Sequence, residues 1–100
     1  MARNPDDPEP RIQLAELHFR GATPDKAIPL FVEARRLAGD NRARELYTTQ
    51  RLIDLYLGPV GQPSRALVEL RRLVDRFPGT READSARDLI AKLKQPPPAS

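Results

Sequence analysis

A chain of 100 residues is long enough for one domain, and its lack of cysteine excludes disulfide bonds, thiolate metal sites and cysteine nucleophiles. Its formal net charge of +3 comes from 17 basic and 14 acidic residues that are interspersed, so no block of like charge marks a nucleic-acid site. No apolar stretch reaches the roughly 20 residues that a membrane-spanning helix needs, and we expect no membrane insertion of this segment.

Both ends of the chain are rich in proline, with three prolines in residues 1–10 and three in residues 95–100. Proline removes a backbone donor and blocks regular pairing, so we predict disordered tails at residues 1–6 and 96–100. The folded domain is predicted to span residues 7–95. The first ten residues lack the apolar centre of a signal peptide, which favours the cytoplasm or a soluble domain of a larger protein.

Two helices are predicted in the first half of this domain. The first, "PRIQLAELHF", has Asp7 as a plausible N-cap. The second begins at Thr23, a good N-cap before a proline, and ends at Gly39, while Pro29 should loosen its opening turn. Apolar residues recur at helical spacing on one face of each helix: Ile12, Leu14, Ala15, Leu17, His18 and Phe19 in the first, and Ala27, Leu30, Phe31, Ala34, Leu37 and Ala38 in the second.

Three further helices are predicted in the second half. The third follows Asp40 or Asn41 as its cap and stops at Gly58, the fourth begins at Pro63, and the fifth is capped by Thr80. Their apolar faces are Ala43, Leu46, Tyr47, Leu52, Ile53, Tyr56 and Leu57, then Ala66, Leu70, Leu73, Val74 and Phe77, then Ala83, Ala86, Leu89, Ile90 and Leu93. No segment alternates with period two, so an all-α fold is predicted.

Two nine-residue stretches share one pattern: "TPDKAIPLF" at residues 23–31 and "QPSRALVEL" at residues 62–70. Both have proline second, a basic residue fourth, alanine fifth and a large apolar residue ninth. Ala66 lies 39 positions after Ala27, which indicates a repeated helix–turn–helix unit. A small residue at these two positions lets helix backbones approach closely.

The repeat resembles the tetratricopeptide (TPR) family, whose 34-residue unit has the signature W-x2-L-G-x2-Y, then A-x3-F, then P. The positions that match this pattern are Leu14, Ala15, His18, Ala27, Phe31 and Ala34 in the first unit, and Leu52, Tyr56, Ala66, Leu70 and Pro78 in the second. The chain lacks the tryptophan and the signature glycine. The resemblance implies a right-handed helical solenoid of two helix–turn–helix repeats and a C-terminal capping helix.

The resemblance also implies a concave groove, lined by the first helix of each repeat, that binds a protein or peptide segment. On matching positions its lining is Ile12, Glu16, Phe19, Arg20, Tyr47, Gln50, Arg51, Asp54, Leu57, Asp84 and Asp88. Glu16, Asp54 and Asp88 would form an acidic row, which suits a segment with basic and apolar residues. The alternative is that these acids are solvated residues on exposed helix faces.

Two other interpretations stay open. Arginines on the second helices of the repeats, expected to face away from the groove, could contact nucleic acid, although Phe31 and Phe77 look like core residues rather than stacking platforms. These arginines are Arg35, Arg36, Arg65, Arg71, Arg72 and Arg76. The chain could also self-associate through the exposed edge of its first helix, at Ile12 or Leu17.

Catalytic chemistry finds no support in the sequence, and we expect no enzyme activity, metal or cofactor. His18 is the only histidine and occupies an apolar helix face, where a core position is the simpler interpretation. The chain has no G-x-S-x-G elbow and no phosphate-binding glycine loop. Its paired acids fall on a terminal segment and on an exposed helix, away from any pocket that could shift their pKa values.

Overall fold

The computed structural model describes residues 7–94, and within them it contains five α-helices, one 3₁₀ turn and no strand. The elements are α1 (Glu9–Arg20), η1 (Pro24–Lys26), α2 (Ala27–Ala38), α3 (Arg42–Leu57), α4 (Pro63–Arg76) and α5 (Arg81–Lys94). The predicted all-α fold with five helices is therefore confirmed. The predicted tails at residues 1–6 and 96–100 lie outside the described residues.

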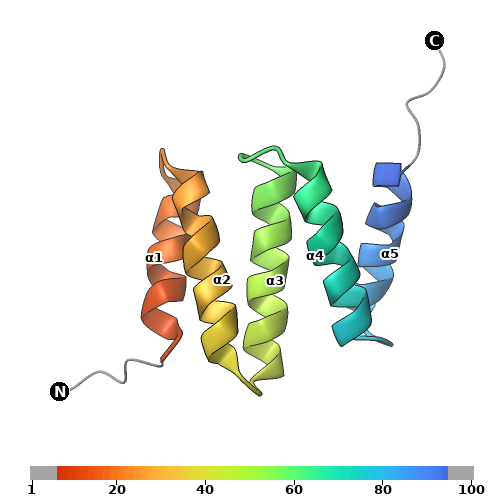
Figure 1. The fold of residues 1–100 in the computed structure, drawn as a ribbon, viewed down its shortest axis with the longest axis horizontal. Coiled ribbons are helices and arrows are strands. Elements are labelled where there is room, and N and C mark those ends of the chain that lie inside the picture. The colour runs from red at the N-terminus through yellow and green to blue at the C-terminus, as the bar shows by residue number, and fades with distance from the viewer. Residues whose placement is uncertain (1–6, 95–100) are drawn as a thin grey trace, which may run out of the picture.

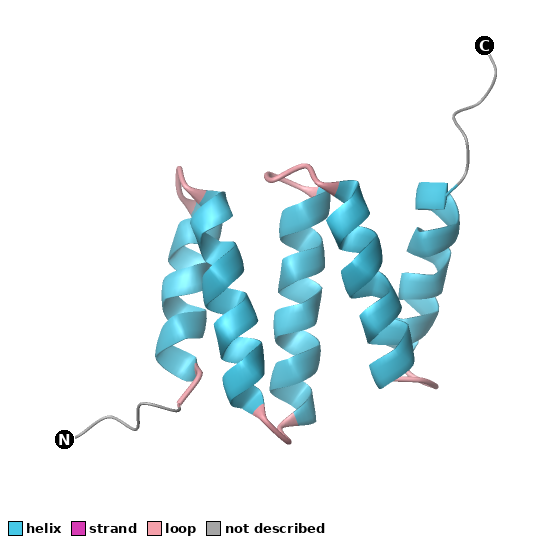
Figure 2. Cartoon of the chain, in the orientation of Figure 1, coloured by secondary structure: helices cyan, strands magenta, loops and turns pink. Residues whose placement is uncertain are grey.

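The helices run up and down in chain order, and each packs against the next along the chain. In Figure 1, α2 and α4 lie in front of α1, α3 and α5, so the molecule has two layers. Short loops join consecutive helices (Figure 2). Among the helices of residues 7–94, none combines the length and the apolar character that crossing a membrane requires.

Side-chain caps begin three of the helices, as the sequence predicts. The Asp7 carboxylate accepts a hydrogen bond from the backbone N–H of Glu9 at 3.0 Å. Asn41 accepts one from the N–H of Arg44 at 3.1 Å, and the Thr80 hydroxyl accepts one from the N–H of Ala83 at 3.1 Å. Each bond satisfies a helix-terminal donor that otherwise has no partner.

The predicted capping role of Thr23 is wrong. Its hydroxyl lies 2.9 Å from Nδ1 of His18 instead, and its side chain accepts no hydrogen bond from the helix that follows. The chain then passes through the 3₁₀ turn before α2 starts at Ala27. This start leaves Pro29 in the first helical turn, where its missing N–H disrupts no helical hydrogen bond. The 3₁₀ entry agrees with the predicted loosening of this opening.

Two apolar clusters meet at α3. The first joins α1, α2, α3 and the start of α4, and consists of Ile12, Ala15, Ala27, Phe31, Ala34, Leu52, Leu55, Tyr56 and Ala66. The second joins α3, α4 and α5, and consists of Ile53, Leu70, Leu73, Phe77, Ala83 and Ala86. Ala27 and Ala66 are both fully buried, as their small size at a close helix crossing requires.

Several predicted positions on α1 and at the start of α3 are wrong. Leu14 and Leu17, expected on the packed face of α1, are 46% and 64% exposed. Ala43 is exposed as well, because α3 begins only one residue earlier. Ile12 is buried in the first cluster and so cannot serve as an anchor in an open groove. Among residues 7–94, α1 packs mainly against α2, and only Ile12 and Ala15 on this helix are buried.

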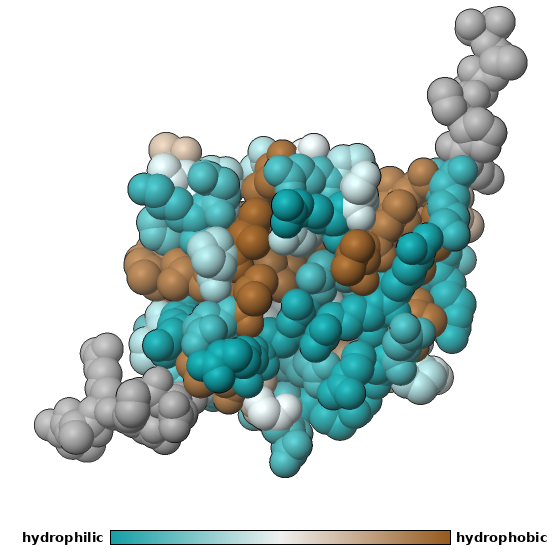
Figure 3. All heavy atoms as spheres, in the orientation of Figure 1, coloured by the Kyte–Doolittle hydropathy of each residue, from teal (hydrophilic) through white to brown (hydrophobic). Residues whose placement is uncertain are grey.

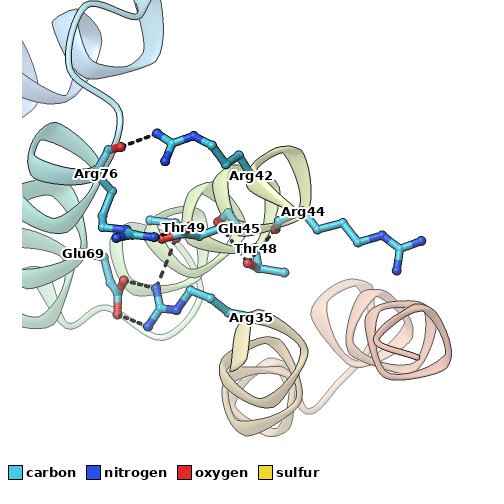
Figure 4. Close-up of polar contacts among 8 residues, drawn as sticks. All are labelled: Arg35, Arg42, Arg44, Glu45, Thr48, Thr49, Glu69 and Arg76. Atoms are coloured by element: carbon cyan, nitrogen blue, oxygen red, sulfur yellow. Dashed lines mark hydrogen bonds and ion pairs between the residues drawn. The ribbon is translucent and has the colours of Figure 1, made fainter. Parts of the chain in front are cut away.

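A polar contact layer connects α2, α3 and α4 (Figure 4). Arg35 of α2 makes two hydrogen bonds to the carboxylate of Glu69 on α4 and donates a third to the Thr49 hydroxyl at 3.2 Å. The side chains of Arg35 and Glu69 are only 12% and 11% exposed. Thr48, fully buried, donates its hydroxyl hydrogen to the backbone of its own helix. Arg35, one of the arginines considered for nucleic-acid contact, is therefore already engaged within the helix stack.

A second ion pair joins α3 to α4. Arg76 holds the nearly buried carboxylate of Glu45 with two hydrogen bonds, at 2.7 and 2.9 Å. The hydrogen bond from Arg76 lowers the pKa of Glu45, and the same bond raises the pKa of Arg76. Arg42 donates to the backbone carbonyl of Arg76 and lies over the Phe77 ring, 4.7 Å from its centroid. These contacts fix the C-terminal end of α4 against the start of α3.

Candidate interaction groove

The gap between α1 and α3 is closed by four side chains, which we name the α1–α3 clamp: Glu16, Phe19, Tyr47 and Arg51. Arg51 donates two hydrogen bonds to the Glu16 carboxylate, at 2.7 and 2.8 Å. Tyr47 donates its hydroxyl hydrogen to the same carboxylate at 2.6 Å. The Arg51 guanidinium lies over the Phe19 ring, 4.1 Å from its centroid, in cation–π geometry.

The contacts within the clamp shift the pKa values of Glu16, Tyr47 and Arg51. Burial alone would raise the pKa of Glu16, but the hydrogen bonds from Arg51 and Tyr47 outweigh it, and the pKa is lowered. Burial, with the bond to Glu16, raises the pKa of Tyr47. The bond to Glu16 raises the pKa of Arg51. Glu16 is thus a carboxylate already paired within the protein, rather than one presented to a partner.

The corresponding gap between α3 and α5 is open and forms a groove of about 420 Å³. Its floor and inner walls are apolar, and its rim is polar. The apolar lining residues are Ile53, Leu70, Leu73, Ala86 and Leu89, and the remaining ones are Tyr47, Gln50, Arg51, Asp54, Arg81, Glu82 and Ser85. Tyr47 and Arg51 therefore belong to both the clamp and the α3–α5 groove.

Four of the five predicted α3 residues line the groove, and the three acids of the predicted row have different surroundings. Tyr47, Gln50, Arg51 and Asp54 all line the groove. Leu57, at the end of α3, is 37% exposed but is not part of the lining. Two acids of the row pair with the same arginine: Arg51 holds Glu16 in the clamp and forms an ion pair with Asp54 at 3.2 Å.

On α5 the predicted face is displaced around the helix. Asp84 and Asp88 are exposed and outside the groove lining, and Asp84 pairs with Arg87 at 3.0 Å. The residues that line the groove from α5 are Arg81, Glu82, Ser85, Ala86 and Leu89. The buried positions Ala83 and Ala86 could have indicated this orientation, because the groove residues flank them on one side at helical spacing.

Two further predicted residues of α1 are Phe19, which belongs to the clamp, and Arg20, which lies beside it. Phe19 is half-buried against the first cluster, and Arg20 is exposed, with its Nε donating to the backbone carbonyl of Glu16 at 3.4 Å. His18 contacts Thr23 and lies outside the groove lining. Among residues 7–94, no group of three or more histidine, aspartate or glutamate side chains is arranged to hold a metal ion. The chemistry that the groove offers is apolar contact with a few polar groups.

Comparisons with known proteins find no matching family model, and no significant match among curated proteins or solved structures.

Proposed function

We propose that this chain is a TPR-like, non-catalytic interaction module that binds a partner polypeptide segment in the α3–α5 groove. The observation that carries the proposal is the groove itself, about 420 Å³ in volume, with an apolar floor and a polar rim. Sites that bind other molecules are typically concave, mostly apolar and bordered by a few polar groups.

The repeated arrangement of the helices supports a TPR-like solenoid. Ala27 and Ala66 occupy matching positions at the starts of α2 and α4, and both are fully buried. Consecutive helices pack against each other throughout the described part of the chain. In such a stack, α1, α3 and α5 share one side, which is the side on which the resemblance places a partner.

The chemistry of the lining defines the partner that fits. Apolar side chains of the segment would cover Ile53, Leu73 and Leu89 on the floor. Asp54, which is 58% exposed and shares Arg51 with Glu16, would receive a basic residue. The rim carries both signs of charge, at Arg81 and Glu82, so apolar contact supplies most of the affinity and salt weakens binding only modestly.

The test is selection of binding peptides followed by blocking of the groove. Random displayed peptides are enriched on the full chain, and the affinity of the enriched peptides is measured by fluorescence anisotropy. Replacing Ser85, which is exposed and lines the groove, by tryptophan fills the space between α3 and α5. We expect Ser85→Trp to weaken binding by about tenfold or more, since about 1.4 kcal/mol of lost contact gives this factor.

Ala91→Trp is the matched control, because Ala91 is also exposed on α5 but lies outside the groove lining. This variant should bind the enriched peptides as the unmodified chain does. Equal binding by both tryptophan variants, or a failure to enrich any peptide, would contradict the proposal.

A further inference from the structure

The outer face of α4 carries three arginines, Arg65, Arg71 and Arg72, around the exposed side chain of Val68. All three are exposed and form no ion pair with any residue in the described range 7–94, and Val68 is 62% exposed. Of the nearby acids, Glu69 is held by Arg35 and Glu45 by Arg76, whereas Asp75 lies on α4 itself beside Arg71 and Arg72. Positive charge therefore predominates on this face, where the three arginines outnumber the single acid Asp75.

Shallow hollows flank Arg71 on this face. One, of about 430 Å³, is lined by Val68, Arg71, Arg72, Asp75 and Arg76. The other, of about 260 Å³, lies between α4 and α5 and is lined by Arg71, Val74, Asp75, Arg87 and Ile90. Asp75 is the one acid among these lining residues. In Figure 3, hydrophilic surface predominates over the lower part of α4, with apolar patches beside it.

We propose that this arginine face of α4, defined by Arg65, Val68, Arg71 and Arg72, is a second docking surface for an acidic polypeptide segment with aliphatic residues. Carboxylates of the segment would pair with the unpaired guanidinium groups, which bind carboxylates in two-point geometry. An aliphatic side chain would cover Val68. Arg65 and Arg72 are seven positions apart on the helix, a separation of about 10 Å, which acids two helical turns apart on a partner helix match.

The composition of the face favours polypeptide over nucleic acid. No aromatic residue is among those that line either hollow, so bases would find no stacking surface. Asp75 lies between the two hollows and would repel a phosphate backbone, whereas an acidic peptide can place an aliphatic residue there. Val68 and Val74 offer apolar contact that a sugar–phosphate chain does not use.

The experiment measures anisotropy of a labelled synthetic peptide in which glutamate and leucine recur at helical spacing. Three further probes are a peptide with lysine in place of glutamate, a single-stranded RNA and a DNA duplex. We expect the acidic peptide to bind, with an affinity that falls as salt rises, and the lysine peptide not to bind. The double variant Arg71→Glu/Arg72→Glu should weaken binding by about tenfold or more, and Val68→Ser by about threefold.

The control changes the net charge equally at two exposed lysines away from α4, in Lys26→Glu/Lys92→Glu. Circular dichroism checks that each variant keeps its helices. Unchanged binding by the α4 variant, an equal loss in the control, or tighter binding of RNA or DNA than of the acidic peptide would overturn the proposal. Ser85→Trp should leave acidic-peptide binding intact, so this surface and the α3–α5 groove are tested separately.

Discussion

The gap between α1 and α3 is closed by side chains, whereas the gap between α3 and α5 is open. Between α1 and α3, Arg51 pairs with Glu16 and lies over Phe19, and Tyr47 donates to Glu16, so the protein's own side chains close the gap. Between α3 and α5, no such set of contacts forms, and a groove with an apolar floor remains. The two gaps therefore differ in whether the chain's own side chains bridge them.

The comparison shows how a small helical protein can set apart a binding surface. On α1, the long side chains of Glu16 and Phe19 reach across to α3. On α5, the residues at the groove include the short side chains of Ser85 and Ala86. The space left by short side chains is where a partner can supply apolar contacts of its own.

Of the changes at the two gaps, replacement of Arg51 should lower the stability the most. Arg51→Ala leaves the Glu16 carboxylate, only 18% exposed, without its main partner and removes the contact with Phe19. Because the pair is partly and not fully buried, we expect a loss of about 2 to 3 kcal/mol in the free energy of unfolding, measured by urea denaturation. Arg81→Ala, at the open gap, should change it by less than about 0.5 kcal/mol. Similar losses in both variants would remove the distinction between the gaps.

Enlarging a buried alanine on each side should have unequal effects. Ala15, fully buried in the first cluster, has no space for a larger side chain, so Ala15→Leu should cost about 2 kcal/mol of stability. Ala86 lines the groove, into which a leucine can extend, so Ala86→Leu should cost less than about 1 kcal/mol. Thermal unfolding followed by circular dichroism compares the two, and a larger loss at Ala86 would contradict the open space assigned to the groove.

Tyr47 lies at both gaps, so its variants can distinguish the contribution of the closed gap to stability from that of the open groove to binding. Tyr47→Phe removes the hydrogen bond to Glu16 while keeping the ring that lines the groove. We expect a loss of about 1 kcal/mol in stability, with unchanged binding of the peptides enriched on the groove. Tyr47→Ala should lower both the stability and the affinity for the enriched peptides. Weaker peptide binding by Tyr47→Phe would mean that the hydroxyl, rather than the ring, serves the partner.

The smallest effect concerns pH. The folded-state pKa of Glu16 is lowered, so the unfolded chain binds a proton at this position more readily than the folded one. The stabilisation is therefore present above the ordinary glutamate pKa of about 4.3 and is lost as the pH falls below it. Glu16→Gln should show a weaker decline in stability between about pH 5 and pH 3, measured by urea unfolding at each pH. An identical decline would remove Glu16 from this role.

Local patterns in the sequence predict the helices and most of their ends. Prolines and capping residues identify the starts, and glycines with positive φ values, Gly39 at 56° and Gly79 at 80°, follow the ends of α2 and α4. The matched alanines Ala27 and Ala66 were predicted to be buried, and they are. These features depend on neighbours within a few residues, which is the range that a sequence pattern reports.

The polar part of the interior could not be predicted in the same way. Glu45, Thr48, Thr49 and Glu69 are buried, although apolar periodicity assigns such residues to the surface. Their burial depends on partners far away in the chain, as with Glu69, whose partner Arg35 lies 34 positions earlier. The internal pairing of Glu16 was missed for the same reason, since its contact with Arg51 follows from how the helices meet.

The ion pair between Arg35 and Glu69 should make the unfolding of the central helices cooperative. In a stack held only by contacts between successive helices, helices can detach one at a time from either end. This bridge spans from the second helix to the fourth over Thr49 of the third, and so the three central helices should lose their order in a single cooperative event. Amide hydrogen exchange should then show one shared opening free energy for α2, α3 and α4, with earlier exchange in α1 and α5.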